Sequence, residues 1–147
     1  MSDFDFRYVE QLIVALALTS VTVVIHGCGM NWVRSYFKRS WSPAKTQVRP
    51  RSQLVVMIGI VALIVVTHTA EVAVWALFYA LRGLVPHWLS AVYFSIASYT
   101  TLGESGITLP VHWQGLGGFE AMAAMLMFGW STAMLAAIML KLQSIDT

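Results

Sequence analysis

The stretch Ser90–Pro110, SAVYFSIASYTTLGESGITLP, decides how this chain folds. Its first half reads as a short apolar helix rich in Ser, Thr and Tyr. The second half, from Thr100 to Gly106, is too polar and too rich in glycine to continue an apolar helix, because glycine weakens a helix interior by ~1 kcal/mol. Whether this break lies in water or in lipid depends on the rest of the chain.

The composition is that of an integral membrane protein. Hydrophobic residues make up 58% of the 147 residues and charged residues only 11%, which excludes an ordinary soluble domain. The single cysteine, Cys28, excludes an internal disulfide and a cysteine-only metal site within one subunit. Basic residues gather without an acidic residue in one predicted loop: Arg34, Lys38, Arg39, Lys45, Arg49 and Arg51. This run indicates a loop retained in the cytoplasm rather than nucleic-acid binding.

Three apolar segments predict three transmembrane helices. Gln11–Val33 carries no charge, and its 23 residues make a helix of about 34 Å, enough to cross a hydrocarbon core of ~30 Å. Gln53–Leu81 has one charge, Glu71, and Ala121–Leu140 forms the last span. The N-terminus lacks the basic region and cleavage site of a signal peptide, so we expect it to be retained. The positive-inside rule predicts an outer N-terminus, an irregular cytoplasmic loop over residues 34–51 and a cytoplasmic C-terminus.

Residues 83–103 are uncharged and admit two interpretations. As a full span they would place residues 104–120, with two acidic and no Lys or Arg residues, in the cytoplasm. As a re-entrant segment they would enter the membrane and return to the same side. Orientation follows Lys and Arg, which favours the re-entrant interpretation. Backbone that leaves a helix at membrane depth then needs protein or a water-filled cavity around it, because lipid cannot satisfy its N–H and C=O groups.

Residues 100–106, TTLGESG, resemble the selectivity-filter strand of potassium channels, whose pattern is T-T-V-G-Y-G-D. Thr100, Thr101 and Gly103 agree with that pattern, and Leu102 stands at the Val position. The remaining positions differ, with Glu104 in place of Tyr, Ser105 in place of Gly and Gly106 in place of Asp. Residues 93–95, YFS, resemble the pore helix of that family, and residues 128–133, FGWSTA, its inner helix. The likeness covers residues 66–140 and is to small bacterial potassium-channel-like membrane proteins.

This resemblance implies an all-α integral membrane protein of the bacterial inner membrane. Residues 1–52 would form the N-terminal transmembrane helix and the basic cytoplasmic loop, and residues 53–147 the pore module. The module would contain an outer helix (53–82), a re-entrant pore helix (87–100), a filter-like loop (101–110) and an inner helix (117–141). Nothing repeats internally, so a fourfold pore needs four chains, and we expect a homotetramer.

The resemblance also implies a cation channel rather than an enzyme. Carbonyl oxygens of Thr101, Leu102 and Gly103 would replace the hydration shell of the permeant ion, with the Thr101 hydroxyl adding a ring of oxygens. The permeant ion would be K⁺ or Na⁺, or a divalent cation held at Thr101 and Glu104. We expect no other cofactor and no nucleic acid. Membrane lipid and further copies of the chain are the expected partners, and an additional membrane partner stays open.

Glu104 decides how far the filter is altered, and three outcomes are open. It pairs with a cation such as Arg82, it is protonated in an apolar site, or it joins a ring of four carboxylates at the pore mouth. We favour the ring, which would attract cations broadly and weaken potassium selectivity. The main alternative to a channel is a degenerate, non-conducting filter, retained in a membrane scaffold or accessory subunit.

His68 and Glu71 form an intramembrane polar pair, and with Trp75 and Tyr79 they share one helical face. A charged carboxylate at mid-membrane costs ~2.5–3.5 kcal/mol on insertion scales, so we expect both to face protein. We favour a structural pair. The alternative is a proton relay or buried cation site, which would make the chain a metal- or proton-handling membrane subunit.

The sequence His26-Gly27-Cys28-Gly29 suggests a metal site, but residues two apart on a helix do not face each other. His26 also lies 7 residues from the inner end of its apolar segment and His68 about 15 from the inner end of the next. At ~1.5 Å per residue the two differ in height by about 12 Å, more than a coordination shell spans. We therefore expect no joint site, and interpret the glycines as close helix packing.

Small residues recur every four positions on the last helix, at Gly129, Ala133 and Ala137. This stripe predicts either close helix contact or the lining of a pore, with a hinge at Gly129. Glu120 near the start of that helix suits the helix dipole, with an added role at the pore mouth left open, and Arg82 is expected to snorkel at the interface.

The carboxylate-ring hypothesis predicts that Glu104→Gln alters cation flux and selectivity. Removing four negative charges from the mouth would lower the local concentration of cations. Flux of K⁺, Na⁺ and Ca²⁺ from proteoliposomes measures this effect. Unchanged flux and selectivity would contradict the ring.

Overall fold

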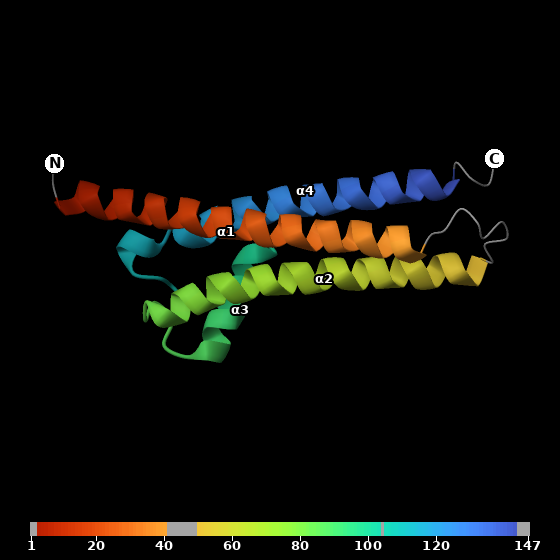
Figure 1. The fold of residues 1–147 in the computed structure, drawn as a ribbon. Helices are drawn as coiled ribbons and strands as arrows, with labels where there is room; N and C mark the ends of the chain where they lie inside the picture. The colour runs from red at the N-terminus through yellow and green to blue at the C-terminus, as the bar shows by residue number, and fades with distance from the viewer. Residues whose placement is uncertain (1–2, 41–49, 104, 144–147) are drawn as a thin grey trace.

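The computed structural model describes residues 3–40, 50–103 and 105–143, and in this part of the chain all regular structure is helical. Three long helices form a bundle (Figure 1): α1 (Asp3–Ser40), α2 (Pro50–Leu81) and α4 (Leu116–Gln143). Between α2 and α4 lie a short helix, α3 (Trp88–Tyr99), and a 3-10 turn, η1 (Val111–Trp113).

Three segments are long and apolar enough to cross a membrane, namely Phe6–Ser40, Gln53–Leu81 and Val111–Leu142. Only 22 to 28% of the residues in their most apolar windows are buried within the chain. Their outward faces are therefore apolar, as expected for helices in contact with lipid. The predicted all-helical fold with three long apolar helices is confirmed.

The long helices lie side by side over most of their length (Figure 1). α1 and α4 run in the same direction, and α2 runs antiparallel to both. We call the end where α1 begins and α2 finishes the near end, and the opposite end the far end. α1 packs against α2 and α4, and α3 packs against α2 and α4.

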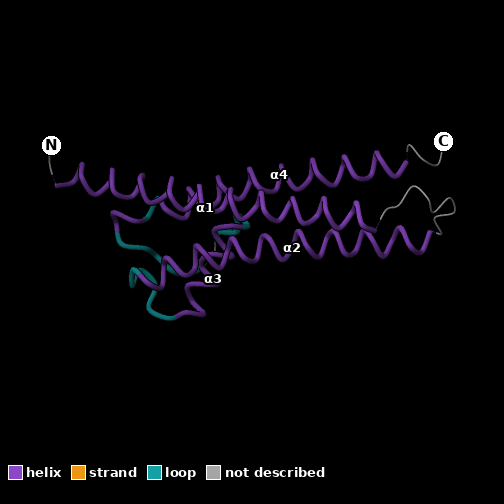
Figure 2. Tube along the Cα trace, in the orientation of Figure 1, coloured by secondary structure: helices purple, strands orange, loops and turns teal. Residues whose placement is uncertain are grey.

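α3 reaches the middle of the bundle and the chain then returns to the near end (Figure 2). Its 12 residues make a helix of about 18 Å, too short to cross a membrane. The hydroxyl of its last residue, Tyr99, donates a hydrogen bond to Glu71, well inside α2. After the return, Trp113 of η1 packs on Phe78 near the end of α2, with ring centres 5.9 Å apart.

Gln11 of α1 anchors the returning chain. Oriented so that donors meet acceptors, its amide nitrogen donates to the His112 carbonyl (2.8 Å) and its oxygen accepts from the Leu116 N–H (3.0 Å). The first N–H groups of a helix have no partner within the helix, so this side chain satisfies one at the start of α4. Gln11 is buried, as a polar residue with its bonds satisfied can be.

Two apolar clusters form the core, one at each end of the bundle. The near cluster gathers Trp75, Tyr79, Phe94, Trp113 and Leu116 with smaller residues. The far cluster contains Met30, Val33, Phe37, Ile60, Ile64 and Ile138. Between them the long helices bury several polar residues, among them Thr22, His26, Thr67, Glu71 and Ser131.

The predicted irregular loop over residues 34–51 is wrong at both ends. α1 continues through Arg34–Ser40, and α2 begins at Pro50. Lys and Arg are good helix formers, and Lys38 and Arg39 lie in the last turn, where positive charge suits the helix dipole. Pro50 takes the first helical position, where its missing N–H does no harm. Residues 41–49 lie outside the described part of the chain.

Gly29 allows α1 to approach α2 closely. A Cβ at Gly29 would lie 2.9 Å from Cβ of Thr67, whereas one at Gly27 would meet only Trp130, at 3.8 Å. We predict that Gly29→Ala destabilises the protein by ~1–3 kcal/mol through overpacking. Gly27→Ala is the matched control and should leave stability unchanged or slightly raised, because alanine favours a helix. Thermal unfolding in detergent measures both, and equal stability of the two variants would contradict the close approach.

Candidate functional site

Glu71 lies at the centre of the polar residues between the two apolar clusters. Its Oε1 is 2.8 Å from Nδ1 of His26, and its Oε2 is 3.2 Å from Nδ1 of His68. The Tyr99 hydroxyl donates to the same Oε2. His26 and Glu71 are fully buried, and His68 is 14% exposed. The carboxylate is therefore surrounded by three hydrogen-bonding groups away from lipid.

Ser131 of α4 closes the group on the opposite side of the imidazole rings. Its Oγ lies 3.1 Å from Nε2 of His68 and 3.3 Å from Nε2 of His26. Each histidine thus bridges Glu71 through Nδ1 and Ser131 through Nε2. We call these five residues the polar layer: His26 from α1, His68 and Glu71 from α2, Tyr99 from α3 and Ser131 from α4.

Satisfying every contact of the polar layer takes one proton more than two neutral histidines, Tyr99, Ser131 and an ionised Glu71 supply. If both histidines are neutral, His26 donates from Nδ1 to Glu71 and accepts the Ser131 proton at Nε2, while His68 donates from Nε2 to Ser131. Nδ1 of His68 then has no proton, although it faces Oε2 of Glu71 at 3.2 Å and the Tyr99 oxygen at 2.8 Å. A proton or another cation there completes every contact and balances the Glu71 charge.

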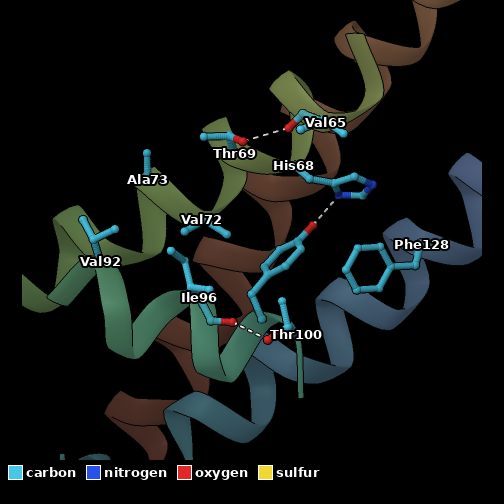
Figure 3. A pocket seen from close by; sticks show the side chains of 10 residues that line it. Val65, His68, Thr69, Val72, Ala73, Val92, Ile96, Thr100 and Phe128 are labelled. Carbon is cyan, nitrogen blue, oxygen red and sulfur yellow. Dashed lines mark hydrogen bonds between the residues drawn. The ribbon is translucent and has the colours of Figure 1, made fainter. Parts of the chain in front are cut away.

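Aromatic rings enclose the polar layer. Phe128 lies 4.8 Å from His68, and Trp130 lies 5.2 Å from His26, both between ring centres. On one side the layer borders an apolar groove of about 360 Å³ between α2, α3 and α4. Figure 3 shows His68 and Phe128 on one edge of this groove, with Thr100 at the end of α3 near Phe128, and Ile96 and Val92 of α3 toward the opposite edge. His68 and Tyr99 are thus the members of the polar layer that line the groove.

A second buried carboxylate, Glu120, ties α4 to α2 and α3. It accepts hydrogen bonds from the Tyr79 hydroxyl (2.8 Å) and from the Ser95 hydroxyl (2.5 Å). Nearby, Nε1 of Trp75 donates to Thr22 of α1 at 3.0 Å. Among the described residues, every buried side-chain nitrogen and oxygen has a hydrogen-bond partner.

The turn after α3 has unusual backbone geometry. The φ angles of Thr101, Gly103 and Gly106 are positive, at 60°, 73° and 66°. N–H groups of the turn close the end of α3, with Gly103 N bonded to Ala97 O and Thr101 N to Ser98 O, both at 3.0 Å. Among the described residues no backbone N–H is bonded to the carbonyls of Thr101 and Leu102, and residues 101–103 are exposed. These carbonyls are available to water or to a cation.

The other predicted site residues lie apart from the polar layer. Thr100 closes the end of α3 and Ser105 is partly buried in the turn, while Glu104 lies outside the described residues. Arg82 pairs with Glu10 at 3.0 Å, with both side chains about half exposed. The stripe of Gly129, Ala133 and Ala137 is exposed along α4, and no atom of another element lies within 4 Å of a Cβ built at Gly129.

The expectation that His26 and His68 cannot share a site is wrong. The depth of each histidine was counted from the end of its apolar segment, but the helices α1 and α2 extend beyond those segments. His26 lies about 14 residues before the end of α1 at Ser40 and His68 about 18 after the start of α2 at Pro50. The offset of four residues is only about 6 Å, and the tilt and rotation of the helices bring the two ring centres to 5.3 Å.

From the sequence alone we did not predict that Ser95 and Ser131 have hydrogen-bonding roles. We also did not predict that Tyr99 is part of the polar layer. A signal was present, because polar groups in apolar membrane helices must find partners inside the protein. Their identities as partners depended on how α3 packs against α2 and how α4 packs against α1 and α3. The comparisons with known proteins supply no further assignment: no protein-family model, curated protein or solved structure matches this chain.

We predict that the buried hydrogen bond from Tyr79 to Glu120 contributes more to stability than the exposed ion pair between Arg82 and Glu10. Tyr79→Phe leaves the buried Glu120 without one donor and should lower the free energy of unfolding by ~1–3 kcal/mol. Glu10→Gln removes the exposed pair with Arg82 and should change it by less than ~1 kcal/mol. Thermal unfolding in detergent compares the two, and an equal or larger effect at Glu10 would contradict the role of Glu120.

Proposed function

We propose that the chain is the pore-forming subunit of a homotetrameric cation channel, with α3 as a re-entrant pore helix and the following turn as a filter with altered selectivity. The observation that carries this proposal is the path of the chain between α2 and α4. It enters the bundle as a helix of 12 residues, turns at the level of the polar layer and returns to the near end.

The backbone of the turn supports this function because it would not be stable in lipid. The carbonyls of Thr101 and Leu102 and the exposed backbone at Gly103 lie at the depth of the middle of α2. At that depth only protein or water satisfies them. Four copies around an axis would enclose the turns in a water-filled path, where carbonyl oxygens and the Thr101 hydroxyl coordinate a monovalent cation.

The exposed stripe on α4 supports the same assembly. Gly129, Ala133 and Ala137 are exposed in the single chain, although α4 is otherwise bordered by the other helices on one side. Small side chains suit either contact with a neighbouring copy or the wall of a lumen. In the tetramer α4 is the inner helix, with Gly129 as its point of bending, and α2 is the outer helix.

The orientation follows from the positions of the charges. Arg34, Lys38 and Arg39 lie on the far end of α1, and Lys141 lies near the far end of α4. From the positive-inside rule we propose that the far end lies in the cytoplasm and the pore mouth outside. The membrane would be a bacterial inner membrane, as the resemblance implies. Glu104 at the mouth gives the filter its preference for cations over anions and reduces discrimination among them.

The proposal predicts that Gly103→Ala abolishes cation flux from K⁺-loaded proteoliposomes. Gly103 has φ +73°, which a Cβ disfavours by roughly 1–2 kcal/mol, so alanine would reshape the filter backbone. Gly83→Ala is the matched control: its φ is +64°, and a Cβ there, as at Gly103, meets no atom within 4 Å. It carries the same backbone strain in the turn between α2 and α3 and should retain flux.

Two results would contradict the channel. The first is wild-type protein that passes neither K⁺, Na⁺ nor Ca²⁺, which would favour a non-conducting scaffold. The second is a detergent-solubilised particle containing one or two chains, because a fourfold axis is then absent. Equal flux in the two glycine variants would show that Gly103 is not part of the filter.

A further inference from the structure

Three side chains of the polar layer place metal-binding atoms at one point. His26, His68 and Glu71 each offer one metal-binding atom, and these three atoms lie within 4.8 Å of one another. Nδ1 of each histidine faces the Glu71 carboxylate. They come from the two helices α1 and α2, held together by the close approach at Gly29 and Thr67. Two imidazoles and a carboxylate are a ligand set that suits Zn²⁺ and similar divalent transition metals.

Ser131 orients both imidazoles for such a site. A serine oxygen has two lone pairs, so in the metal-bound protein it would accept hydrogen bonds from both Nε2–H groups, whose nitrogens lie 3.1 and 3.3 Å from Oγ. Both Nδ1 lone pairs then point toward the Glu71 carboxylate. Histidines that bind metals characteristically donate their second ring N–H to a fixed acceptor, which sets the tautomer. In this protein the Ser131 hydroxyl would be that acceptor for both imidazole rings.

The contacts between the imidazoles and the carboxylate are close to the spacing of ligand atoms in a metal site. Ligand atoms around a tetrahedral Zn²⁺ lie about 3.3 Å apart, because the bonds are ~2.0–2.2 Å long. The two Nδ1 atoms are now 2.8 and 3.2 Å from the carboxylate oxygens. Small rotations of these side chains would therefore open the space that an ion needs.

The electrostatics of the polar layer also favour a cation. Glu71 is fully buried, and among the described residues its ion pairs are with the two histidines. Arg82, the nearest basic residue along α2, lies about three turns away and pairs with Glu10. A proton or a metal ion between Nδ1 of His68 and Glu71 would complete this contact. The aromatic rings of Phe128 and Trp130 limit competition from water.

We propose that His26 Nδ1, His68 Nδ1 and the Glu71 carboxylate form a buried binding site for one Zn²⁺-class divalent transition-metal ion per chain. Ser131 positions both imidazoles, and the fourth coordination position faces the Tyr99 hydroxyl. The ion enters from the groove beside His68, the partly exposed member of the set. The site lies within one chain, so it does not depend on the pore.

Metal binding to the purified protein tests the site directly. Full-length protein without a histidine tag, stripped of metal in detergent, is titrated with ZnCl₂ and with CoCl₂. Bound metal is counted by mass spectrometry, and Co²⁺ absorption reports tetrahedral nitrogen and oxygen ligands. We expect one ion per chain in the wild-type protein, and at least about 10-fold weaker binding in His68→Gln and Glu71→Gln.

Further variants separate the site from other candidates. His87→Gln and Cys28→Ser change exposed residues outside the polar layer and should bind as the wild type does. Ser131→Ala should weaken binding by about 10–100-fold, as loss of a residue that orients a metal ligand does. Size-exclusion profiles and helical circular dichroism show that each variant is folded.

A measurement on the wild-type protein keeps the test decisive if variants fail to fold. X-ray absorption of the Zn²⁺-loaded protein should show two imidazole nitrogens in the first shell. Spectra without imidazole, wild-type protein that retains no Zn²⁺, or undiminished binding in His68→Gln and Glu71→Gln would overturn the proposal. Loss of the ion in Cys28→Ser or His87→Gln would overturn it as well.

Discussion

The contact between one buried carboxylate and two histidines determines how the four helices meet. Glu71 in a membrane span must be satisfied inside the protein, since lipid offers no hydrogen bonds. It binds His26 of α1, His68 of its own helix and Tyr99 of α3, and Ser131 of α4 joins the histidines from the other side. These contacts align the long helices and set how deeply α3 enters the bundle. Removing any one of them would leave a buried polar group without its partner.

The apolar clusters on either side of the polar layer hold the helices together but do not determine their register. Apolar contact between membrane helices is no stronger than contact with lipid, so it does not by itself select one register. The polar layer does, because hydrogen bonds tolerate only small changes in distance and angle. Glu120 repeats the arrangement closer to the near end, where Tyr79 of α2 and Ser95 of α3 donate to it. α3 is thus fixed at its middle by Ser95 and at its end by Tyr99.

The position of Tyr99 links the polar layer to the turn that we propose as a filter. Tyr99 is the last residue of α3, and Thr100 and Thr101 follow it directly. A change in the charge or occupancy of the polar layer therefore acts next to the backbone that leaves the helix. The turn itself is closed onto α3 by its own N–H groups, and its carbonyls at Thr101 and Leu102 point to no backbone donor among the described residues. Hydration, a cation or neighbouring copies would satisfy them.

Much of this architecture follows from local features of the sequence. Composition and apolar segments predicted three membrane-crossing helices, the glycines and polar residues after Tyr99 predicted the end of α3, and the helical spacing of His68 and Glu71 placed them on one face. The C-terminal end of α1 and the start of α2 were missed because residues 34–51 were interpreted as an irregular loop, although α1 continues to Ser40 and α2 begins at Pro50. That error in length produced the wrong depth for His26.

The sequence by itself determined which segments enter the membrane and that Glu71 needs partners within the protein, because hydropathy and helical period are properties of one segment. Only the tertiary structure decided that those partners are His26, His68 and Tyr99, with Ser131 behind the histidines. Partners on different helices depend on the axial offset and rotation between those helices. Both are set by packing over the whole bundle, such as the close approach at Gly29, and no single segment contains them.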